Sequence, residues 1–258
     1  MPHNQTELMS IRLDNKIAWI TGTTRGIGRA LALGFAQRGA IVVATGLSED
    51  HSGLESELKA FNGKSVFLNQ DVSQPDHAER VADEIQKRFG KLDILINNAG
   101  IDPRKAADEI TNGDWAEVID TNLNGAWFTC KAAIPLMKPA GYGKIIQVGS
   151  ITPHYDFKNL THYMSSKMGL EGMTRGLARD LGPHGIRANC LVLGAVKVEK
   201  ENEFGSAPEI EDFVNQHQCI PGRLLPEDTE SVFAFFASAD SDSITGQSLH
   251  VDLGWTHG

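Results

Sequence analysis

Three residues with complementary chemistry, Ser150, Tyr163 and Lys167, are spaced so that a short folded segment can bring them together. Tyr163 and Lys167 stand four positions apart, and residues at i and i+4 of a helix lie on one face, about 5–6 Å apart at Cβ. An ammonium about 4 Å from a phenol favours the phenolate by up to about 4 kcal/mol at an effective dielectric near 20. One pKa unit is about 1.4 kcal/mol, so we expect the pKa of Tyr163 to fall by up to about two to three units. The trio is suited to proton transfer near neutral pH, with the Ser150 hydroxyl close to both groups.

A glycine-rich turn near the N-terminus contains Gly22, Gly26 and Gly28, and it follows an apolar run that reads as a strand. Glycines between a strand and a helix allow a tight turn and the close approach of a pyrophosphate to the helix N-terminus. The spacing differs from G-x-G-x-x-G because one interval is longer, so the turn alone also suits a simple strand–helix connection. The turn therefore predicts a dinucleotide site only in combination with other residues.

The choice of dinucleotide depends on two further positions. NAD is usually recognised by an acidic residue at the end of the second strand, which binds the ribose 2′-hydroxyl. Here that strand is predicted to end at Thr45, and no acid follows before Glu49. Arg25 lies in the glycine-rich turn, where it can pair with a 2′-phosphate. We therefore expect NADP(H) as the preferred cofactor, with NAD(H) as the second choice.

The composition excludes several classes of protein. The chain has 258 residues, of which 41% are hydrophobic and 22% charged, which is ordinary globular composition. Its net charge of -9 argues against a nucleic-acid partner, which normally requires a basic face. The three cysteines form neither a metal-ligand cluster nor a disulfide framework, as is typical of the cytoplasm. No secretory signal, membrane span or metal site is expected.

Short apolar runs alternate with longer helical patterns, which predicts an α/β fold. The fold is a doubly wound, Rossmann-type, seven-stranded parallel sheet with helices on both faces. The expected strands are Lys16–Thr21, Ile41–Thr45, Ser65–Asn69, Leu92–Asn97, Lys144–Val148, Arg187–Leu193 and Ser248–Val251. The clearest expected helices, besides one from the glycine turn through Arg38, are Asp76–Phe89, Trp115–Met137 and His162–Leu181. We expect one domain over residues 1–258, with the weakly patterned segment 197–222 as a substrate lid.

Together these motifs resemble the single-domain short-chain dehydrogenase/reductases over nearly the whole chain. Within that family, the motifs most resemble those of the 3-oxoacyl-acyl-carrier-protein reductases and the sugar and polyol dehydrogenases. The resemblance rests on residues that occur in the order of the family's motifs. These are the glycine turn Thr21–Gly28, Asp71-Val72, Asn97-Asn98-Ala99-Gly100, Asn122, Ser150, Tyr163 and Lys167.

The resemblance implies specific roles for these residues. Asn122, Ser150, Tyr163 and Lys167 correspond to the catalytic tetrad, in which Tyr163 is the general acid/base and Asn122 holds a water linked to Lys167. Asn98 also suits a hydrogen bond at a strand end, and Asp71 suits the cap of a turn. The implied cofactor-binding residues are Gly22, Thr24, Arg25, Gly26, Ile27, Gly28, Asp71, Val72, Asn98, Ala99, Gly100, Tyr163, Lys167, Gly194 and Val196.

The chain departs from the family pattern at three positions. Leu193 stands where the family usually has a proline, and Val198 replaces a threonine whose hydroxyl touches the nicotinamide amide. Leu253 stands where a glycine is common. These departures leave the fold assignment intact, but they bear on nicotinamide anchoring and on turnover.

The substrate is expected to be a small carbonyl compound or secondary alcohol, bound by Ser150, Tyr163, His154 and Tyr155. The alternatives are an acyl-carrier thioester as substrate, an NAD(H)-dependent sugar or polyol dehydrogenase, and a dinucleotide-binding regulator without turnover. The predicted helices 115–137 and 162–181 carry long apolar faces, and the corresponding helices of the family form oligomer interfaces. The resemblance thus implies a homo-oligomer, usually a tetramer.

Overall fold

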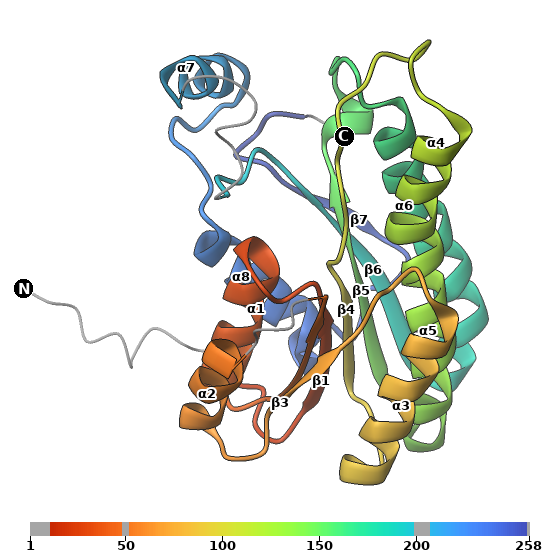
Figure 1. Cartoon of the computed structure of the whole chain (residues 1–258). Helices are drawn as coiled ribbons and strands as arrows, with labels where there is room; N and C mark the ends of the chain where they lie inside the picture. The colour runs from red at the N-terminus through yellow and green to blue at the C-terminus, as the bar shows by residue number, and fades with distance from the viewer. Residues whose placement is uncertain (1–10, 48–51, 199–206, 257–258) are drawn as a thin grey trace, which may run out of the picture.

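The computed structural model of the protein describes residues 11–47, 52–198 and 207–256. Its centre is a seven-stranded sheet in the order β3-β2-β1-β4-β5-β6-β7, in which every neighbouring pair is parallel (Figure 1). The strands are β1 (Ile17–Thr21), β2 (Ile41–Gly46), β3 (Val66–Asn69), β4 (Ile94–Asn97), β5 (Gly143–Ser150), β6 (Ile186–Leu193) and β7 (Ser248–Val251). This confirms the predicted fold class.

Helices cover both faces of the sheet, because the central strands are apolar on both sides. One face packs against α1 (Gly26–Gln37), α2 (Ser52–Phe61) and α8 (Pro226–Ala237). The other packs mainly against α3 (Pro75–Phe89), α5 (Gly125–Met137) and α6 (Thr161–Leu181). Two further helices are α4 (Asn112–Ile119), which precedes α5, and α7 (Ala207–His217), which stands apart from the sheet (Figure 1).

The strand order places the crevice for a ligand. β1 is followed by α1 on one face, whereas the neighbouring β4 leads to helices on the opposite face. Ligands of open α/β sheets bind at such a switch point, beyond the carboxyl ends of the strands. Thr21, Asn97 and Ser150 are the last residues of β1, β4 and β5, so their neighbourhoods meet at this edge.

The predicted helical segment Trp115–Met137 is helical throughout, but its hydrogen-bonding pattern changes in the middle. The chain forms α4, then a π-helical turn over Asp120–Asn124, and only then α5. Such turns in helices are frequent at functional sites, and this one contains Asn122. The Asn122 side chain bonds the Ile101 backbone in both directions, which gives it a fixed place in the widened turn.

Two further expectations were a substrate lid over residues 197–222 and a chain without a membrane span. Part of the predicted lid, residues 199–206, lies outside the described residues, and the helix α7 occupies much of the remainder. Among the helices of the described ranges, none is both long and apolar enough to cross a membrane.

Candidate active site

The structure brings Ser150, Tyr163 and Lys167 together at the carboxyl edge of the sheet. Ser150 ends β5, while Tyr163 and Lys167 occupy successive turns near the start of α6. Their i, i+4 spacing places the Lys167 Nζ 5.6 Å from the centroid of the Tyr163 ring. The Ser150 side chain is close enough to the phenol to favour a lower Tyr163 pKa, so a hydroxyl, a phenol and an ammonium share one site.

The expected direction of the Tyr163 pKa was wrong for the protein alone. Burial raises the pKa of Tyr163 to about 12, and this effect outweighs the hydrogen bond from Ser150, which acts in the opposite direction. Burial also lowers the pKa of Lys167 to about 8, because the protein disfavours its charged form. The isolated i, i+4 argument failed because it counted the attraction between charges and left out the loss of hydration.

Asn122 is held rigidly at the back of the site. It is buried, its Oδ1 accepts from the Ile101 N–H at 2.8 Å, and its Nδ2 donates to the Ile101 carbonyl at 2.8 Å. Its Nδ2 also donates to Ser166 Oγ at 3.1 Å, and Ser166 in turn donates to the Tyr163 carbonyl at 2.7 Å. A Cβ on Gly100 would lie 3.3 Å from Asn122 Oδ1 and 3.6 Å from Lys167 Nζ, so both groups flank this glycine.

The loop after β4 fixes the glycine-rich turn through Asn98. Its Nδ2 donates to the carbonyls of Thr21 and Gly22 at 2.9 and 3.0 Å. The Thr21 Oγ1 accepts from the backbone N–H groups of Asn98 and Ala99 at 3.0 and 3.1 Å. Asn98 is therefore the strand-end hydrogen-bonding residue that its position suggested, and it shapes the turn from the neighbouring strand.

The turn requires glycine at defined positions. Gly22 and Gly26 have φ angles of 68° and 52°, in the left-handed region that favours glycine. A Cβ on Gly28 would lie 2.1 Å from the Gly22 carbonyl oxygen, and a Cβ on Gly22 would lie 2.8 Å from Ala99 Cα. The backbone is thus free of side chains where α1 begins.

The N-terminus of α1 is suited to an anion. Its first turn contains no acidic residue, and the residue before it, Arg25, makes no side-chain cap. The first backbone N–H groups of a helix lack partners within the helix, and they favour negative charge. The glycine-lined turn and these donors fit the pyrophosphate of a dinucleotide.

The predicted cofactor residues around this turn occupy different environments. Thr24 and Arg25 are exposed, whereas Ile27 is half-buried against the apolar core. Ser48 and Glu49, which follow β2, lie outside the described residues. Leu47 is 68% exposed at the end of β2, where a residue reading the adenosine ribose would stand.

Asp71 and Val72 follow β3 and have clear structural contacts. Asp71 Oδ1 accepts from the N–H and the hydroxyl of Ser73 at 3.0 and 2.7 Å, so it caps the turn before α3. A Cβ on Gly125 would lie 2.9 Å from the Val72 carbonyl oxygen, which shows how closely this turn packs on α5. Their contact with adenine stays a prediction.

The segment after β6 crosses toward the glycine turn. A Cβ on Gly194 would lie 2.7 Å from Asp252 Cα, so only glycine fits this close approach. Val196 bridges to Leu224, and Val198 Cγ1 would lie 3.5 Å from a Cβ on Gly26. The departure from threonine at Val198 therefore places an apolar side chain beside the glycine-rich turn.

Leu253 adopts the backbone conformation of the glycine that the family pattern suggested there. Its φ is 55°, which is uncommon for a side chain of this kind. Its carbonyl accepts from the N–H groups of Cys219 and Ile220, each at 3.0 Å. This turn joins the C-terminal segment to the end of the predicted lid.

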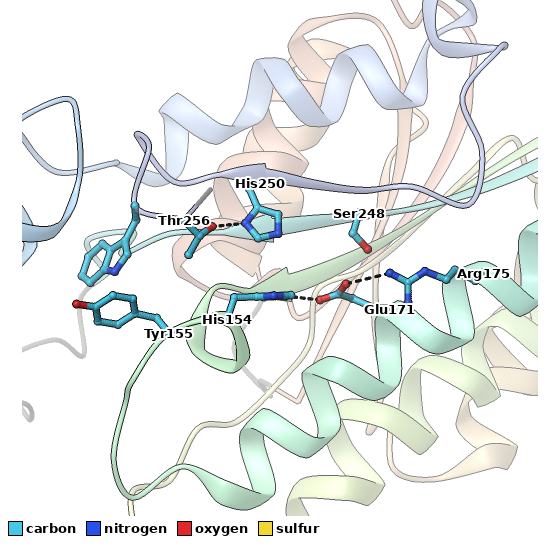
Figure 2. Close-up of a pocket in the computed structure, with 8 residues that line it drawn as sticks. His154, Tyr155, Glu171, Arg175, Ser248, His250 and Thr256 are labelled. Atoms are coloured by element: carbon cyan, nitrogen blue, oxygen red, sulfur yellow. Dashed lines mark hydrogen bonds and ion pairs between the residues drawn. The ribbon is translucent and has the colours of Figure 1, made fainter. Parts of the chain in front are cut away.

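His154 and Tyr155 line a cavity of about 530 Å³, but its lining contains no member of the tetrad. Figure 2 shows the His154 imidazole directed at Glu171 of α6, with His250 of β7 on its other side. Tyr155 lines the same cavity, and its ring centroid lies 5.6 Å from that of Trp255. Their contact with a substrate stays a prediction.

An aromatic cluster joins the loop after Ser150 to α7. Trp255 stacks on His217 with a centroid distance of 5.6 Å and an interplanar angle of 15°. Tyr155 contacts both rings edge-on, at 5.6 and 5.3 Å, and Phe157 and Phe213 complete the cluster. The cluster holds α7 close to the loop that follows Ser150.

Sequence reasoning missed three residues that organise the site. Thr21 was treated as part of a turn, Ser166 as helix packing, and Glu171 was not considered. Ser166 and Glu171 stand three and eight positions after Tyr163, so helical periodicity places them on or near its face of α6. That spacing is the signal that could have identified them.

Comparisons with known proteins agree with this geometry. A family model described as enoyl-(acyl carrier protein) reductase matches residues 22–256. The chain is 38% identical to D-xylose 1-dehydrogenase of Caulobacter vibrioides, over 94% of this chain and 96% of that protein. It is 33% identical to the 3-oxoacyl-acyl-carrier-protein reductase of Escherichia coli, over 95% and 98%.

A solved structure gives the same result in three dimensions. The gluconate 5-dehydrogenase of Burkholderia cenocepacia, in complex with NADP and tartrate, superposes with a TM-score of 0.89 at 30% identity. The match covers 95% of this chain and 96% of that one. Fold, motif order and full-length similarity all lead to one assignment: the chain belongs to the short-chain dehydrogenase/reductase family of oxidoreductases.

Proposed function

We propose that the protein is an NADP(H)-dependent oxidoreductase that transfers a hydride between nicotinamide and a carbonyl group or secondary alcohol. The observation that carries this proposal is the meeting of Ser150, Tyr163 and Lys167 beside the glycine-rich turn. The turn and the start of α1 would hold the pyrophosphate, with Asn98 shaping the turn. The cofactor would supply the hydride, and the protein would supply orientation and proton chemistry.

Tyr163 acts as the general acid during carbonyl reduction. Because its pKa lies near 12, it carries its proton at neutral pH and can donate it to the substrate oxygen. The nearness of the Ser150 hydroxyl to the same phenol supports a role in holding that oxygen as negative charge develops. In the direction of alcohol oxidation, Tyr163 accepts the proton instead.

Lys167 stabilises the tyrosinate that forms when Tyr163 has donated its proton. Its Nζ donates to the Val148 carbonyl at 2.8 Å, which anchors the ammonium beneath the ring. Asn122 and Lys167 flank Gly100 together, which supports a role for Asn122 in holding a water between the lysine and solvent. Protons would return to Tyr163 along this route.

Tyr163→Phe tests the proposed acid. Removal of the hydroxyl should lower kcat by about 10²- to 10⁴-fold, while the dissociation constant for NADPH changes little. Tyr142→Phe is a matched control, because the Tyr142 ring lies 4.5 Å from Lys16 Nζ, at the opposite end of the strands. Wild-type turnover in Tyr163→Phe, with the control also active, contradicts the assigned role.

The preference for NADP(H) rests on Arg25. Its side chain is exposed at the start of α1, and the described end of β2 offers no acid to bind the ribose 2′-hydroxyl. A charge-assisted hydrogen bond to the 2′-phosphate contributes about 1.5–3 kcal/mol, or roughly 10- to 150-fold in affinity.

Arg25→Gln should therefore weaken NADPH by about 10-fold or more and leave NADH nearly unchanged. Parallel thermal-shift titrations measure both, since a ligand at one hundred times its dissociation constant stabilises by about 2.7 kcal/mol. Arg80→Gln is the control, because this arginine bonds the Asn69 carbonyl and takes no part in the turn. Equal weakening of both cofactors contradicts a 2′-phosphate contact.

A small polar ketone or sugar suits the site better than an acyl-carrier thioester. The acyl-carrier partner is acidic, so its docking surface needs free basic groups. Of the basic residues that could contribute to such a surface, Lys105 is paired with Asp114 at 2.6 Å. The xylose and gluconate dehydrogenases among the relatives favour the same choice, and an NAD(H)-dependent sugar dehydrogenase is the second candidate. Hydride transfer measured across sugars, polyols and 3-oxoacyl thioesters distinguishes them.

The surface of the chain and its cysteines support proposals about its assembly and its compartment. The chain acts as one domain, with α7 and its flanking residues as a substrate lid. The exposed apolar side chains on α4, α5 and α6 support association into a homotetramer. All three cysteines are free thiols, which fits a reducing cytoplasm.

A further inference from the structure

A buried carboxylate lies behind the catalytic loop, outside the tetrad. Glu171 belongs to α6, its side chain is 4% exposed, and its Oε1 lies 2.6 Å from His154 Nε2 (Figure 2). A buried carboxylate is costly unless it is hydrogen-bonded or paired. His154 is the close partner that meets this requirement.

The other charged and titratable groups near the pair lie farther from it or bond to other residues. Arg175 approaches Glu171 at 3.7 Å, but its side chain is 63% exposed. The His250 ring lies 4.8 Å from the His154 ring, and its Nδ1 bonds the Thr256 hydroxyl. Asp252 engages Thr256, and Cys190 lies within electrostatic range of Glu171. The short bond between Glu171 and His154 is thus the main link across this part of the cavity.

The link joins the two segments that carry the catalytic groups. His154 ends the short 3₁₀ turn Thr152–His154, which follows Ser150 in the chain. Glu171 stands four residues after Lys167 and eight after Tyr163, so all three lie along one side of α6. The pair therefore ties the serine-bearing loop to the helix that bears the phenol and the ammonium.

The 3₁₀ turn is also bonded directly to the catalytic serine. Thr152 donates its backbone N–H to Ser150 Oγ at 3.2 Å, and the two hydroxyl oxygens lie 3.1 Å apart. The His154 N–H donates to the Ile151 carbonyl at 2.8 Å, which closes the turn. A shift of His154 away from α6 is thereby transmitted to the Ser150 hydroxyl.

We propose that Glu171 and His154 are positioning residues, whose buried hydrogen bond holds the 152–154 turn against α6 and so keeps the Ser150 hydroxyl on Tyr163. This proposal rests on the proposed hydride-transfer function. It assigns His154 to the support of Ser150, because its imidazole is committed to Glu171. The role is exerted through Ser150, since neither residue touches the phenol.

A double-mutant cycle tests the pair. His154→Ala and Glu171→Ala should each lower kcat about 10- to 100-fold, because small misplacements of a catalytic group have effects of this size. The dissociation constant for NADPH should stay within about twofold, since the glycine-rich turn is untouched. The double variant should be no slower than either single variant, because the second removal breaks a bond that is already lost.

Two matched variants separate positioning from general damage. Glu171→Gln keeps a side chain that can bond the imidazole, so it should recover most of the kcat lost in Glu171→Ala. Arg175→Gln removes the exposed charge from the other side of the same carboxylate and should keep kcat within about twofold. Amide hydrogen exchange of residues 151–157 should be faster in the two alanine variants and unchanged in Arg175→Gln.

The possible failures are distinguishable. Additive losses in the cycle, or unchanged exchange of 151–157 in Glu171→Ala, overturn the positioning role even when the wild type is active. A parallel loss of NADPH affinity also overturns it, because the effect is then global. Absence of hydride transfer by the wild type with every carbonyl tested overturns the proposed function instead. Faster exchange in the alanine variants would then still support the link between the turn and α6.

Discussion

At the residue scale, the fold brings the pKa of Lys167 close to physiological pH. Burial lowers its pKa to about 8, while burial raises that of Tyr163 to about 12. Tyr163, the proposed acid, is therefore fully protonated across the physiological pH range. Lys167 begins to lose its proton within that range. The pH dependence of turnover should follow the protonation of Lys167.

We predict that kcat/KM for carbonyl reduction falls above about pH 8, as Lys167 loses its proton. The profile of kcat/KM reports the ionisations of the free enzyme. Lys167→Arg should show lower activity but no decline near pH 8, because a guanidinium stays charged to above about pH 12. An unchanged limb near pH 8 in Lys167→Arg assigns that ionisation to another group.

Lys167 should also make the free energy of unfolding depend on pH. Its pKa is lowered from 10.5 to about 8 in the folded state, so the unfolded chain binds more protons between these values. Lys167 therefore makes the free energy of unfolding rise with pH from about 8 to 10.5. Urea unfolding at pH 7.5 and 9.5 should show a smaller rise for Lys167→Met than for the wild type. Equal rises contradict the lowered pKa.

At the scale of elements, a buried ion pair joins α1 to α8. Arg38 donates from two nitrogens to the Glu230 carboxylate at 2.7 and 2.8 Å, and the two side chains are 7% and 9% exposed. A third nitrogen donates to the Ile11 carbonyl. A Cβ on Gly34 would lie 2.4 Å from Glu230 Cγ, so the glycine provides the room for this pair.

Glu230→Ala should lower the free energy of unfolding by about 3–5 kcal/mol, because it leaves the Arg38 guanidinium buried without its partner. Replacement of both residues by Met should recover much of this loss, since buried ion pairs exchange well for apolar side chains. Glu84→Ala serves as the control: its pair with Arg88 is solvent-exposed and contributes at most about 1 kcal/mol. Urea denaturation measures all three, and a loss below about 1 kcal/mol in Glu230→Ala contradicts the argument.

At the scale of the whole molecule, the helices beside the active site leave large apolar side chains in solvent. Trp115 of α4, Trp127 of α5 and Met168 of α6 are 41%, 43% and 43% exposed. Exposed apolar groups on neighbouring helices are typical of surfaces that bind another protein. Here the proposed occupant is a second copy of the chain.

Trp127→Glu should therefore shift the protein from tetramers to smaller species at micromolar concentration, because it places a charge in an apolar interface. Multi-angle light scattering measures the mass directly. Leu47→Glu is the matched control, since Leu47 is 68% exposed after β2 and belongs to none of these helices. A monomeric wild type contradicts the proposed assembly, and a Trp127→Glu tetramer contradicts its location.

Much of this molecule could be predicted from its sequence because parallel sheets have a strong local signature. Short apolar runs between helical patterns gave the seven strands, and the order of motifs gave the positions of Ser150, Tyr163 and Lys167. The role of Asn98 at a strand end was also predicted correctly. These features depend on periodicity and on the shared edge of parallel strands.

The remainder depends on three-dimensional surroundings. The π-helical turn at Asn122 changes the hydrogen-bonding pattern of the backbone. The periodicity of apolar residues does not report such a change. The direction of the Tyr163 pKa depends on burial, which no spacing of residues supplies. Glu171 and His154 are seventeen positions apart and meet only because the loop after β5 folds back on α6.

The switch in strand order brings segments from two halves of the chain together at one edge of the sheet. The first half carries the glycine-rich turn, and the second carries Ser150, Tyr163, Lys167 and the aromatic cluster that includes α7. The segments around the aromatic cluster can therefore be varied while the glycine-rich turn is kept. A library of variants confined to 151, 153, 156–158 and 208–217 would sample specificity on an unchanged hydride donor. That modularity offers a physical reason why relatives named for a pentose and for an acyl carrier share this one architecture.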